Sequence, residues 1–178
     1  LMGAEMAYTA KDYEKALHIY KQLKDKAASM ERRQLAKTGM LRSAHMLGNE
    51  EEIIFAATDL LADTKLAPEL SNEAHYYRAK AYLDAGKTDG AMEDLKVLAK
   101  DTRNVYGAEA KYKVAQIYFD GGQTDKAEQE VLNYIEVSTP HTYWLARSFV
   151  LLADVYMKLG RNLDAKQYLL SLKQNYQA

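Results

Sequence analysis

The tripeptide GKT at residues 86–88 is the part of this sequence that comes closest to a chemical motif. It matches the end of a phosphate-binding loop, G-x-x-x-x-G-K-[ST], whose backbone N–H groups and lysine bind nucleotide phosphates. The first glycine of that pattern falls on Ala81, and the residues before it do not alternate as a strand would. Similar stretches recur as FDGGQTDKA at 119–127 and MKLGRNLDA at 157–165. We therefore interpret GKT as one copy of a repeated turn.

The other residue types that carry out chemistry form no catalytic pattern. There is no cysteine, and the acidic clusters DYE, EEE and DKAEQE fall on the outer faces of predicted helices, where charge is normally solvated. No G-x-S-x-G sequence occurs. The histidines lack the HxxxH spacing of a metal-binding pair and are scattered along the chain: His18, His45, His75 and His141. We predict a protein that is not an enzyme and binds no cofactor or metal.

Composition excludes several classes of partner. The net charge is -1, whereas a nucleic-acid-binding surface normally makes a chain basic. No run approaches the 18 apolar residues of a membrane-spanning helix, so we expect no membrane insertion by this segment. The absence of cysteine is compatible with both the cytoplasm and the periplasm. The chain begins at Leu1 without a signal-like segment, and we expect it to be part of a longer protein.

The repeated turn belongs to a longer repeat. Tyr82, Tyr118 and Tyr156 recur at intervals of 36 and 38 residues, each four residues before a glycine. A weaker copy surrounds Gly48, and the first copy keeps only its second half, near Tyr20. Small residues flank the turn in the three clearest copies: Ala79 and Ala91, Ala115 and Ala127, Ala153 and Ala165. We predict five repeats, over residues 1–28, 31–66, 69–104, 106–139 and 141–177.

Each repeat holds two stretches with apolar or small residues at i, i+3, i+4 and i+7, which is the period of a helix. The glycine should end the first helix, since glycine adopts the left-handed conformation at little cost. The recurring alanines should lie where paired helices approach closely. The second helix of a repeat should be capped by a side chain that accepts a backbone N–H, from Asn49, Thr88, Thr124 or Asn162.

This pattern resembles the tetratricopeptide repeat (TPR), W-x2-L-G-x2-Y followed by A-x3-F. The best copy is Phe149-x2-Leu152-Ala153-x2-Tyr156, then Ala165-x3-Leu169. The resemblance implies an all-α, right-handed superhelical solenoid of about five helix–turn–helix repeats, or ten helices. The long period and tyrosine-rich helices are similar to bacterial envelope TPR proteins of the BamD-like and YbgF-like groups. That similarity implies a periplasmic or outer-membrane-associated protein, with a cytoplasmic location as the alternative.

The resemblance also implies a concave groove, lined by the first helix of each repeat, that binds a peptide or protein. Residues at i, i+4 and i+7 or i+8 share a helix face, and Tyr76 and Tyr112 would offer large, rigid contact area. Alternatively, both tyrosines pack against the neighbouring repeat. The predicted partner-binding residues are Arg42, His45, Tyr76, Lys80, Tyr112, Lys113, Gln116, Phe119 and Asp154, in rows that also include Thr38, Asp84, Asp120, Val150 and Met157.

Other positions were weighed as functional sites. The carboxylate clamp of chaperone-binding TPR proteins does not fit, because neither of its asparagines is in place and Leu151 stands at its final arginine. Tyr143 and Trp144 are either an exposed anchor or, as we favour, a cover for the preceding helix. Gly39, inside a predicted helix, allows either a close approach at the groove or simple helix packing. His75 and Arg78 stand where TPR helices carry apolar residues, which predicts weaker packing there.

Three functions fit these observations. The first is a non-catalytic scaffold that binds a protein segment in the groove and contributes to assembling envelope complexes. The second is a structural spacer or self-association module that stacks, for instance as a homodimer, through uncapped ends. The third is a regulatory domain of a larger enzyme. The last helix supports the second function, because its outer side retains Tyr168, Leu169, Leu172 and Tyr176.

Overall fold

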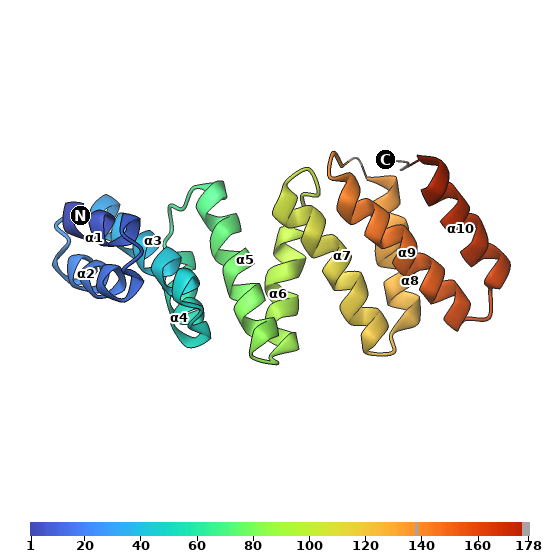
Figure 1. Ribbon diagram of the computed structural model, residues 1–178, viewed down its shortest axis with the longest axis horizontal. Coiled ribbons are helices and arrows are strands. Elements are labelled where there is room, and N and C mark those ends of the chain that lie inside the picture. Colours follow the sequence, from blue (N-terminus) through green and yellow to red (C-terminus); the bar gives the residue numbers. More distant parts are fainter. Residues whose placement is uncertain (138, 176–178) are drawn as a thin grey trace. The chain divides into compact units, whose positions relative to one another are not determined.

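The computed structural model describes residues 1–137 and 139–175, and that part of the chain forms ten α-helices and no strand (Figure 1). The predicted all-α fold is therefore confirmed. One pair of helices lies in each predicted repeat range. In chain order the helices are α1 (Met2–Thr9), α2 (Tyr13–Lys26), α3 (Met30–Leu47), α4 (Glu50–Leu61), α5 (Pro68–Asp84), α6 (Thr88–Leu98), α7 (Val105–Asp120), α8 (Thr124–Glu136), α9 (Thr142–Lys158) and α10 (Asn162–Asn175).

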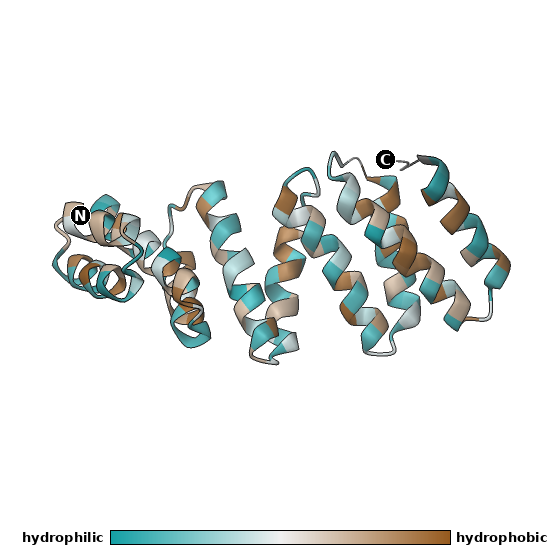
Figure 2. Ribbon diagram, in the orientation of Figure 1, coloured by the Kyte–Doolittle hydropathy of each residue, from teal (hydrophilic) through white to brown (hydrophobic). Residues whose placement is uncertain are grey.

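The helices form two compact units, an N-terminal unit, Leu1–Asp94, and a C-terminal unit, Leu95–Ala178, with the boundary inside α6. In the N-terminal unit each helix from α1 to α5 packs on the next, around a core that includes Met40, Leu41 and Leu60. In the C-terminal unit α7, α8 and α9 pack on one another and α10 packs on α9. Apolar and polar residues alternate around the helices, as expected when each buries only one side (Figure 2). A single array over residues 1–178 stays a prediction.

The recurring glycines form the turns as predicted. Gly48, Gly86, Gly122 and Gly160 have φ values of 67°, 75°, 79° and 77°, the left-handed region that favours glycine. After each glycine, the next N–H donates back to the carbonyl five residues earlier, as in Lys87 N–H to Tyr82 O at 2.7 Å. The amide of Lys87 is thus bound to its own helix and does not face a phosphate. This geometry explains why the motif recurs and why it resembles GKT.

Small residues lie at the close contacts between helices. The six recurring alanines are all buried, as the sequence predicted. Gly39 of α3 has a different explanation from a groove contact: a Cβ at this position would collide with the ring of Tyr20 from α2. Tyr20 is itself in the core of the N-terminal unit. Helix packing, the second interpretation of Gly39, therefore accounts for it.

The predicted helix caps are only partly correct. Asn49 caps α4, accepting the backbone N–H of Glu52 at 3.1 Å. The cap prediction for Thr124 is wrong, because Thr124 is the first residue of α8 and the preceding Gln123 makes no side-chain cap hydrogen bond. Thr88 and Asn162 are likewise the first residues of α6 and α10. In each copy the second helix begins two residues after the left-handed glycine, so the capping position directly follows the glycine. Asn49 stands there in the second repeat, and Lys87, Gln123 and Arg161 stand there in the later ones.

His75 and Arg78 on α5 form a polar cluster with Asp94 of α6. Asp94 is only 1% exposed, and its Oδ1 lies 2.7 Å from both His75 Nδ1 and Arg78 Nη2. Arg78 Nε adds a second contact, to Oδ2 at 2.9 Å. Buried charges are retained in proteins when they are paired in this way. His75 and Arg78, which looked misplaced in the sequence, are therefore the partners of a buried carboxylate on the next helix.

Candidate functional site

In the N-terminal unit the predicted groove residues connect α3 to α5. The guanidinium of Arg42 meets Glu73 through Nε at 2.9 Å and through Nη2 at 3.1 Å. These hydrogen bonds raise the pKa of Arg42 against the opposing effect of burial. The imidazole of His45 stacks on Tyr77, with ring centroids 4.0 Å apart and an interplanar angle of 10°. Both residues thus contribute to packing between repeats as well as to the surface.

The surroundings of His45 favour the neutral form of its imidazole. Partial burial and then the positive charge of Lys80 lower the pKa of His45, and Glu73 opposes this only in part. Lys80 is exposed on α5, where its Nζ lies 3.1 Å from the hydroxyl of Tyr76 and 5.0 Å from the centre of that ring. Tyr76 is half-buried. The pair presents a cation over an aromatic ring on the surface of α5.

A small hollow of about 160 Å³ adjoins this surface in the N-terminal unit. Thr38 and Arg42, both of the predicted rows, line it on α3. Residues of α1 and α2 complete the lining, among them Glu5, Tyr8 and Tyr20. Its volume accommodates a few atoms of a side chain and no complete ligand, because ligand sites usually measure several hundred cubic ångströms.

Tyr112 of α7 is not the exposed anchor that was predicted as one alternative. It is 7% exposed and belongs to the core of the C-terminal unit, where Trp144 lies 5.7 Å from it between ring centroids. Its hydroxyl donates to Gln116 Oε1 at 3.0 Å and accepts from Arg147 Nη2 at 3.0 Å. The alternative, packing against the neighbouring repeat, is correct for Tyr112. Trp144 likewise packs against the preceding repeat, as favoured from the sequence, but Tyr143 is 60% exposed, so the favoured interpretation is wrong for Tyr143.

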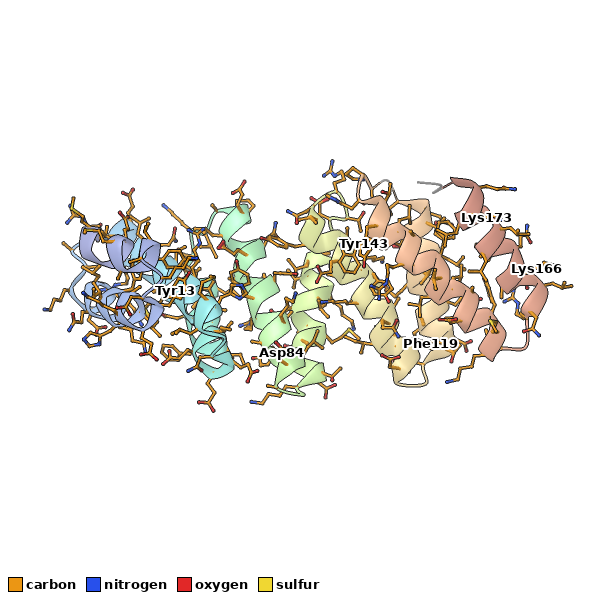
Figure 3. All side chains as sticks on the ribbon, viewed as in Figure 1. Tyr13, Asp84, Phe119, Tyr143, Lys166 and Lys173 are labelled. Carbon is orange, nitrogen blue, oxygen red and sulfur yellow. The ribbon has the colours of Figure 1, made fainter. Side chains whose placement is uncertain are left out.

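The remaining predicted residues of the C-terminal unit lie on or near the surface. Gln116 donates onward to Asp120 at 2.7 Å, which extends the chain of hydrogen bonds from Tyr112 along α7. Lys113 forms an ion pair with Glu109 at 2.8 Å. The ring of Phe119 lies 5.3 Å below the ammonium of Lys158 (labelled Phe119 in Figure 3). These contacts order the side chains of α7 before any partner arrives.

A continuous stripe of exposed residues runs along α9, and we call it the α9 face: Tyr143, Arg147, Val150, Asp154 and Met157. The members are spaced by three or four residues and so share one side of the helix. Its apolar members are largely open to solvent, with Tyr143 60%, Val150 42% and Met157 57% exposed (Tyr143 is labelled in Figure 3). Arg147 and Asp154 lie between them and are also exposed. The face therefore combines apolar contact area with one charge of each sign.

Arg147 is held in place by aromatic residues alone. Its guanidinium lies 4.9 Å from the ring centre of Tyr112 and 5.9 Å from those of Tyr143 and Trp144. It donates to the hydroxyls of Tyr143 and Tyr112, each at 3.0 Å, and these bonds raise its pKa. No carboxylate of the described residues pairs with it. A guanidinium carries five N–H donors, so it retains donors for a partner.

Sequence reasoning did not single out Arg147 as a binding residue. The usable signal is the spacing of Tyr143 and Arg147, four residues apart on a helix, because an aromatic ring and an arginine at that distance are neighbours. The contacts from Tyr112, 35 residues away, are visible only in the structure.

The described residues contain no group of three or more histidine, aspartate or glutamate side chains placed to hold a metal ion. Within the same residues, no helix is long and apolar enough to cross a membrane. On the outer side of α10 the leucines predicted to need a partner are at least partly exposed, and Leu163 is 85% exposed. Tyr176, predicted for that side, lies outside the described residues.

Comparisons with known proteins agree with this geometry. Residues 73–101 and 146–173 each match a family model described as tetratricopeptide repeat. Two crystal structures of MamA resemble the chain with TM-scores of 0.72 and 0.71, at 17% and 18% identity. They cover 97% and 96% of this chain, which covers 87% and 92% of theirs.

A structure of nearly identical TPR-like repeats of a kinesin light chain from Podosopora anserina is also similar. It has a TM-score of 0.63 at 18% identity, with 96% of this chain and 90% of that chain covered. A comparison with curated proteins gave no match. At these identities the structural likenesses establish the fold alone.

Proposed function

Because this chain contains tetratricopeptide repeats in a TPR-like solenoid fold, we propose that it is a non-catalytic scaffold that binds a peptide or protein segment through the exposed faces of the first helices of its repeats. TPR repeats generally mediate protein–protein interaction. The observation that carries the proposal is the α9 face, where apolar side chains remain open to solvent beside a guanidinium that pairs with no carboxylate in the described part of the chain. An association with the bacterial envelope rests on the length of the repeats and on their tyrosine-rich helices, and it stays a prediction.

The chemistry of the α9 face favours an extended or helical segment with an acidic residue between apolar ones. Arg147 is fixed by Tyr112 and Tyr143 before binding, so little side-chain entropy is lost when a carboxylate pairs with it. Tyr143, Val150 and Met157 then supply apolar area on both sides of that contact. Aromatic residues and arginine are the residue types most often responsible for binding energy at interfaces.

Affinity purification from the source cells tests this proposal. Wild type is compared with Val150→Ser/Met157→Ser, which removes apolar area from the α9 face, and with Leu163→Ser, which removes an even more exposed apolar residue on α10. Because all three positions are exposed, circular dichroism and the melting temperature should change little. We expect one or more proteins to be retained by wild type and Leu163→Ser and lost with the double variant. Identical partners on all three baits would contradict the proposal.

Self-association through α10 is a second candidate function. The exposed and adjacent Leu169 and Leu170 favour it, because an exposed apolar patch often marks an interaction site. Sedimentation velocity over a range of concentrations tests it with Leu169→Lys/Leu170→Lys. A dimer that dissociates in the variant would support self-association, and a wild-type monomer at every concentration would exclude it.

A further inference from the structure

Phe55 lies on the second helix of its repeat, whereas the α9 face belongs to a first helix. It lies on α4 with 57% of its side chain exposed, although phenylalanine is among the residues most often buried. A hollow of about 610 Å³ lies on one side of it, lined by Glu51, Ile54, Phe55, Thr58, Asp59, Ala62 and Lys87. A second hollow of about 430 Å³ is lined by Lys21, Asn49, Glu51, Glu52 and Phe55. Phe55 is thus shared by two depressions of the N-terminal unit.

The larger hollow is mainly apolar along α4. Ile54, Phe55, Thr58 and Ala62 follow the helical spacing i, i+1, i+4 and i+8, so they form a continuous strip on one side of α4. The ammonium of Lys24 lies 5.6 Å from the centre of the Phe55 ring. We call Glu51, Ile54, Phe55, Thr58 and Ala62 the Phe55 surface. It offers an ordered aromatic side chain next to space of ligand size.

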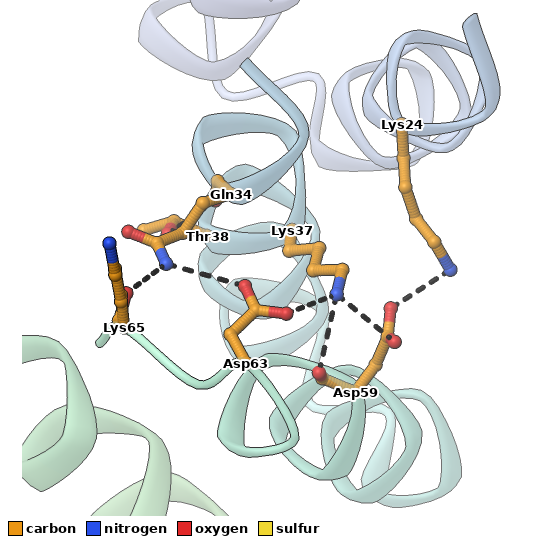
Figure 4. A network of polar contacts seen from close by, with 7 residues as sticks. All are labelled: Lys24, Gln34, Lys37, Thr38, Asp59, Asp63 and Lys65. Atoms are coloured by element: carbon orange, nitrogen blue, oxygen red, sulfur yellow. Dashed lines mark hydrogen bonds and ion pairs between the residues drawn. The ribbon is translucent and has the colours of Figure 1, made fainter. Parts of the chain in front are cut away.

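Most charges around the Phe55 surface are already neutralised. Asp59 meets Lys24 at 2.9 Å and Lys37 at 3.4 Å, and Lys37 also meets Asp63 at 2.7 Å (Figure 4). Burial tends to raise the pKa of Asp59, but these two lysines outweigh it and lower the pKa. Glu52 pairs with Lys21 at 2.7 Å.

Glu51 differs from these carboxylates. It is exposed, it lines both hollows, and it forms no ion pair with any of the described residues. Glu50 lies beside it, also exposed. Lys87 also lines the larger hollow and forms no ion pair with the described residues, whereas Lys21 of the smaller hollow is paired with Glu52. The arrangement therefore favours an apolar group in the larger hollow that carries a positive charge on the side of Glu51 and the smaller hollow.

We propose that the Phe55 surface is a second docking site, for a partner segment that presents a bulky apolar side chain next to a lysine or arginine. The apolar side chain packs against Phe55 and Ile54 in the larger hollow, and the cation pairs with Glu51. This site is separate in the sequence and in chemistry from the α9 face, which favours an acidic segment. The chain would then hold two different partners, or two segments of one partner, as a scaffold requires.

A random peptide library displayed on phage tests this proposal with purified protein. The library is selected on wild type and depleted on Phe55→Ser, and the enriched peptides are synthesised with a fluorescent label. Binding is measured by fluorescence anisotropy for wild type, Phe55→Ser, Glu51→Lys and the matched control Leu163→Ser. Because Phe55 and Glu51 are exposed, the variants should keep the helical spectrum and melting temperature of wild type.

We expect enriched peptides with an apolar residue adjacent to lysine or arginine. Their affinity should fall at least tenfold with Phe55→Ser, fall several-fold with Glu51→Lys in a salt-dependent manner, and stay unchanged with Leu163→Ser. No Phe55-dependent peptide, or a consensus that is acidic, would overturn the proposal. Val150→Ser/Met157→Ser should leave these peptides bound, so a failure of the α9 face and a failure of the Phe55 surface give different results.

Discussion

Replacing Asp94 by asparagine should destabilise the N-terminal unit strongly. The substitution keeps the size of the side chain but removes the charge that pairs with His75 and Arg78, at 2.7 Å each. Breaking one partner of a buried ion pair typically costs about 3–5 kcal/mol, because the remaining charge stays buried without compensation. Arg78 and His75 are partly exposed and can regain some hydration. We therefore expect a loss at the lower end, about 3 kcal/mol.

Urea unfolding followed by circular dichroism at 222 nm measures this loss. With a urea dependence of about 2 kcal/mol per molar, a loss of about 3 kcal/mol lowers the midpoint of the N-terminal unit by about 1.5 M. Glu93→Gln is the matched control, because Glu93 precedes Asp94 on α6 and is exposed. Its midpoint should move by less than about 0.3 M, since exposed substitutions usually change stability by under about 0.5 kcal/mol. Equal shifts for the two variants would refute the reasoning.

The same cluster makes a pH-dependent contribution. Burial tends to raise the pKa of Asp94, but the hydrogen bonds and charges of His75 and Arg78 outweigh it, so the folded pKa lies below the unfolded one. The stabilisation is therefore present above the unfolded pKa of about 4 and is lost as the pH falls through the lower, folded value. The difference in stability between wild type and Asp94→Asn should shrink as the pH falls below about 4. A difference that grows with acidity would contradict this sign.

Three further substitutions test the packing. Tyr112→Ala should lower the free energy of unfolding by about 3–5 kcal/mol, because removing its buried ring leaves a cavity, whereas Tyr143→Ala should lower it by under about 1 kcal/mol. Comparable urea midpoints for the two variants would show that Tyr112 is not part of the core. Gly39→Ala should lower the free energy of unfolding by about 1–3 kcal/mol, and the melting temperature by several degrees, because the added methyl group displaces the Tyr20 ring. An unchanged melting temperature would exclude that contact. Gly160→Ala should destabilise the turn after α9 by about 1–2 kcal/mol because its φ is 77°, and a stabilised variant in calorimetry would disagree.

Features encoded by short spacing were predictable from the sequence. The turn glycines and the buried alanines follow from helical period and from the conformational freedom of glycine, which depend on neighbouring residues only. The cap at Asn49 is also local and was correct. The cap at Thr124 was predicted one residue too far along the chain, because the helical period does not fix the exact residue at which a helix begins.

Features that depend on distant partners were not predictable in the same way. The helical period predicts the side of the helix on which Tyr112 lies. The burial of Tyr112, however, results from Trp144 and Arg147, which are more than 30 residues away. His75 and Arg78 looked like packing defects, because the buried carboxylate that they bind belongs to the next helix. The open donors of Arg147 likewise follow from which residues reach it, and no spacing rule contains that information.

The most direct measurement of the central claim is site-specific photo-crosslinking in the source cells. A benzophenone amino acid replaces Val150 on the α9 face in one version of the protein and Leu163 on α10 in another. The account predicts a discrete adduct with a second protein at position 150 that is absent at position 163 and weakened by the additional substitution Arg147→Glu. No adduct at position 150, or the same adducts at both positions, would contradict binding at the α9 face.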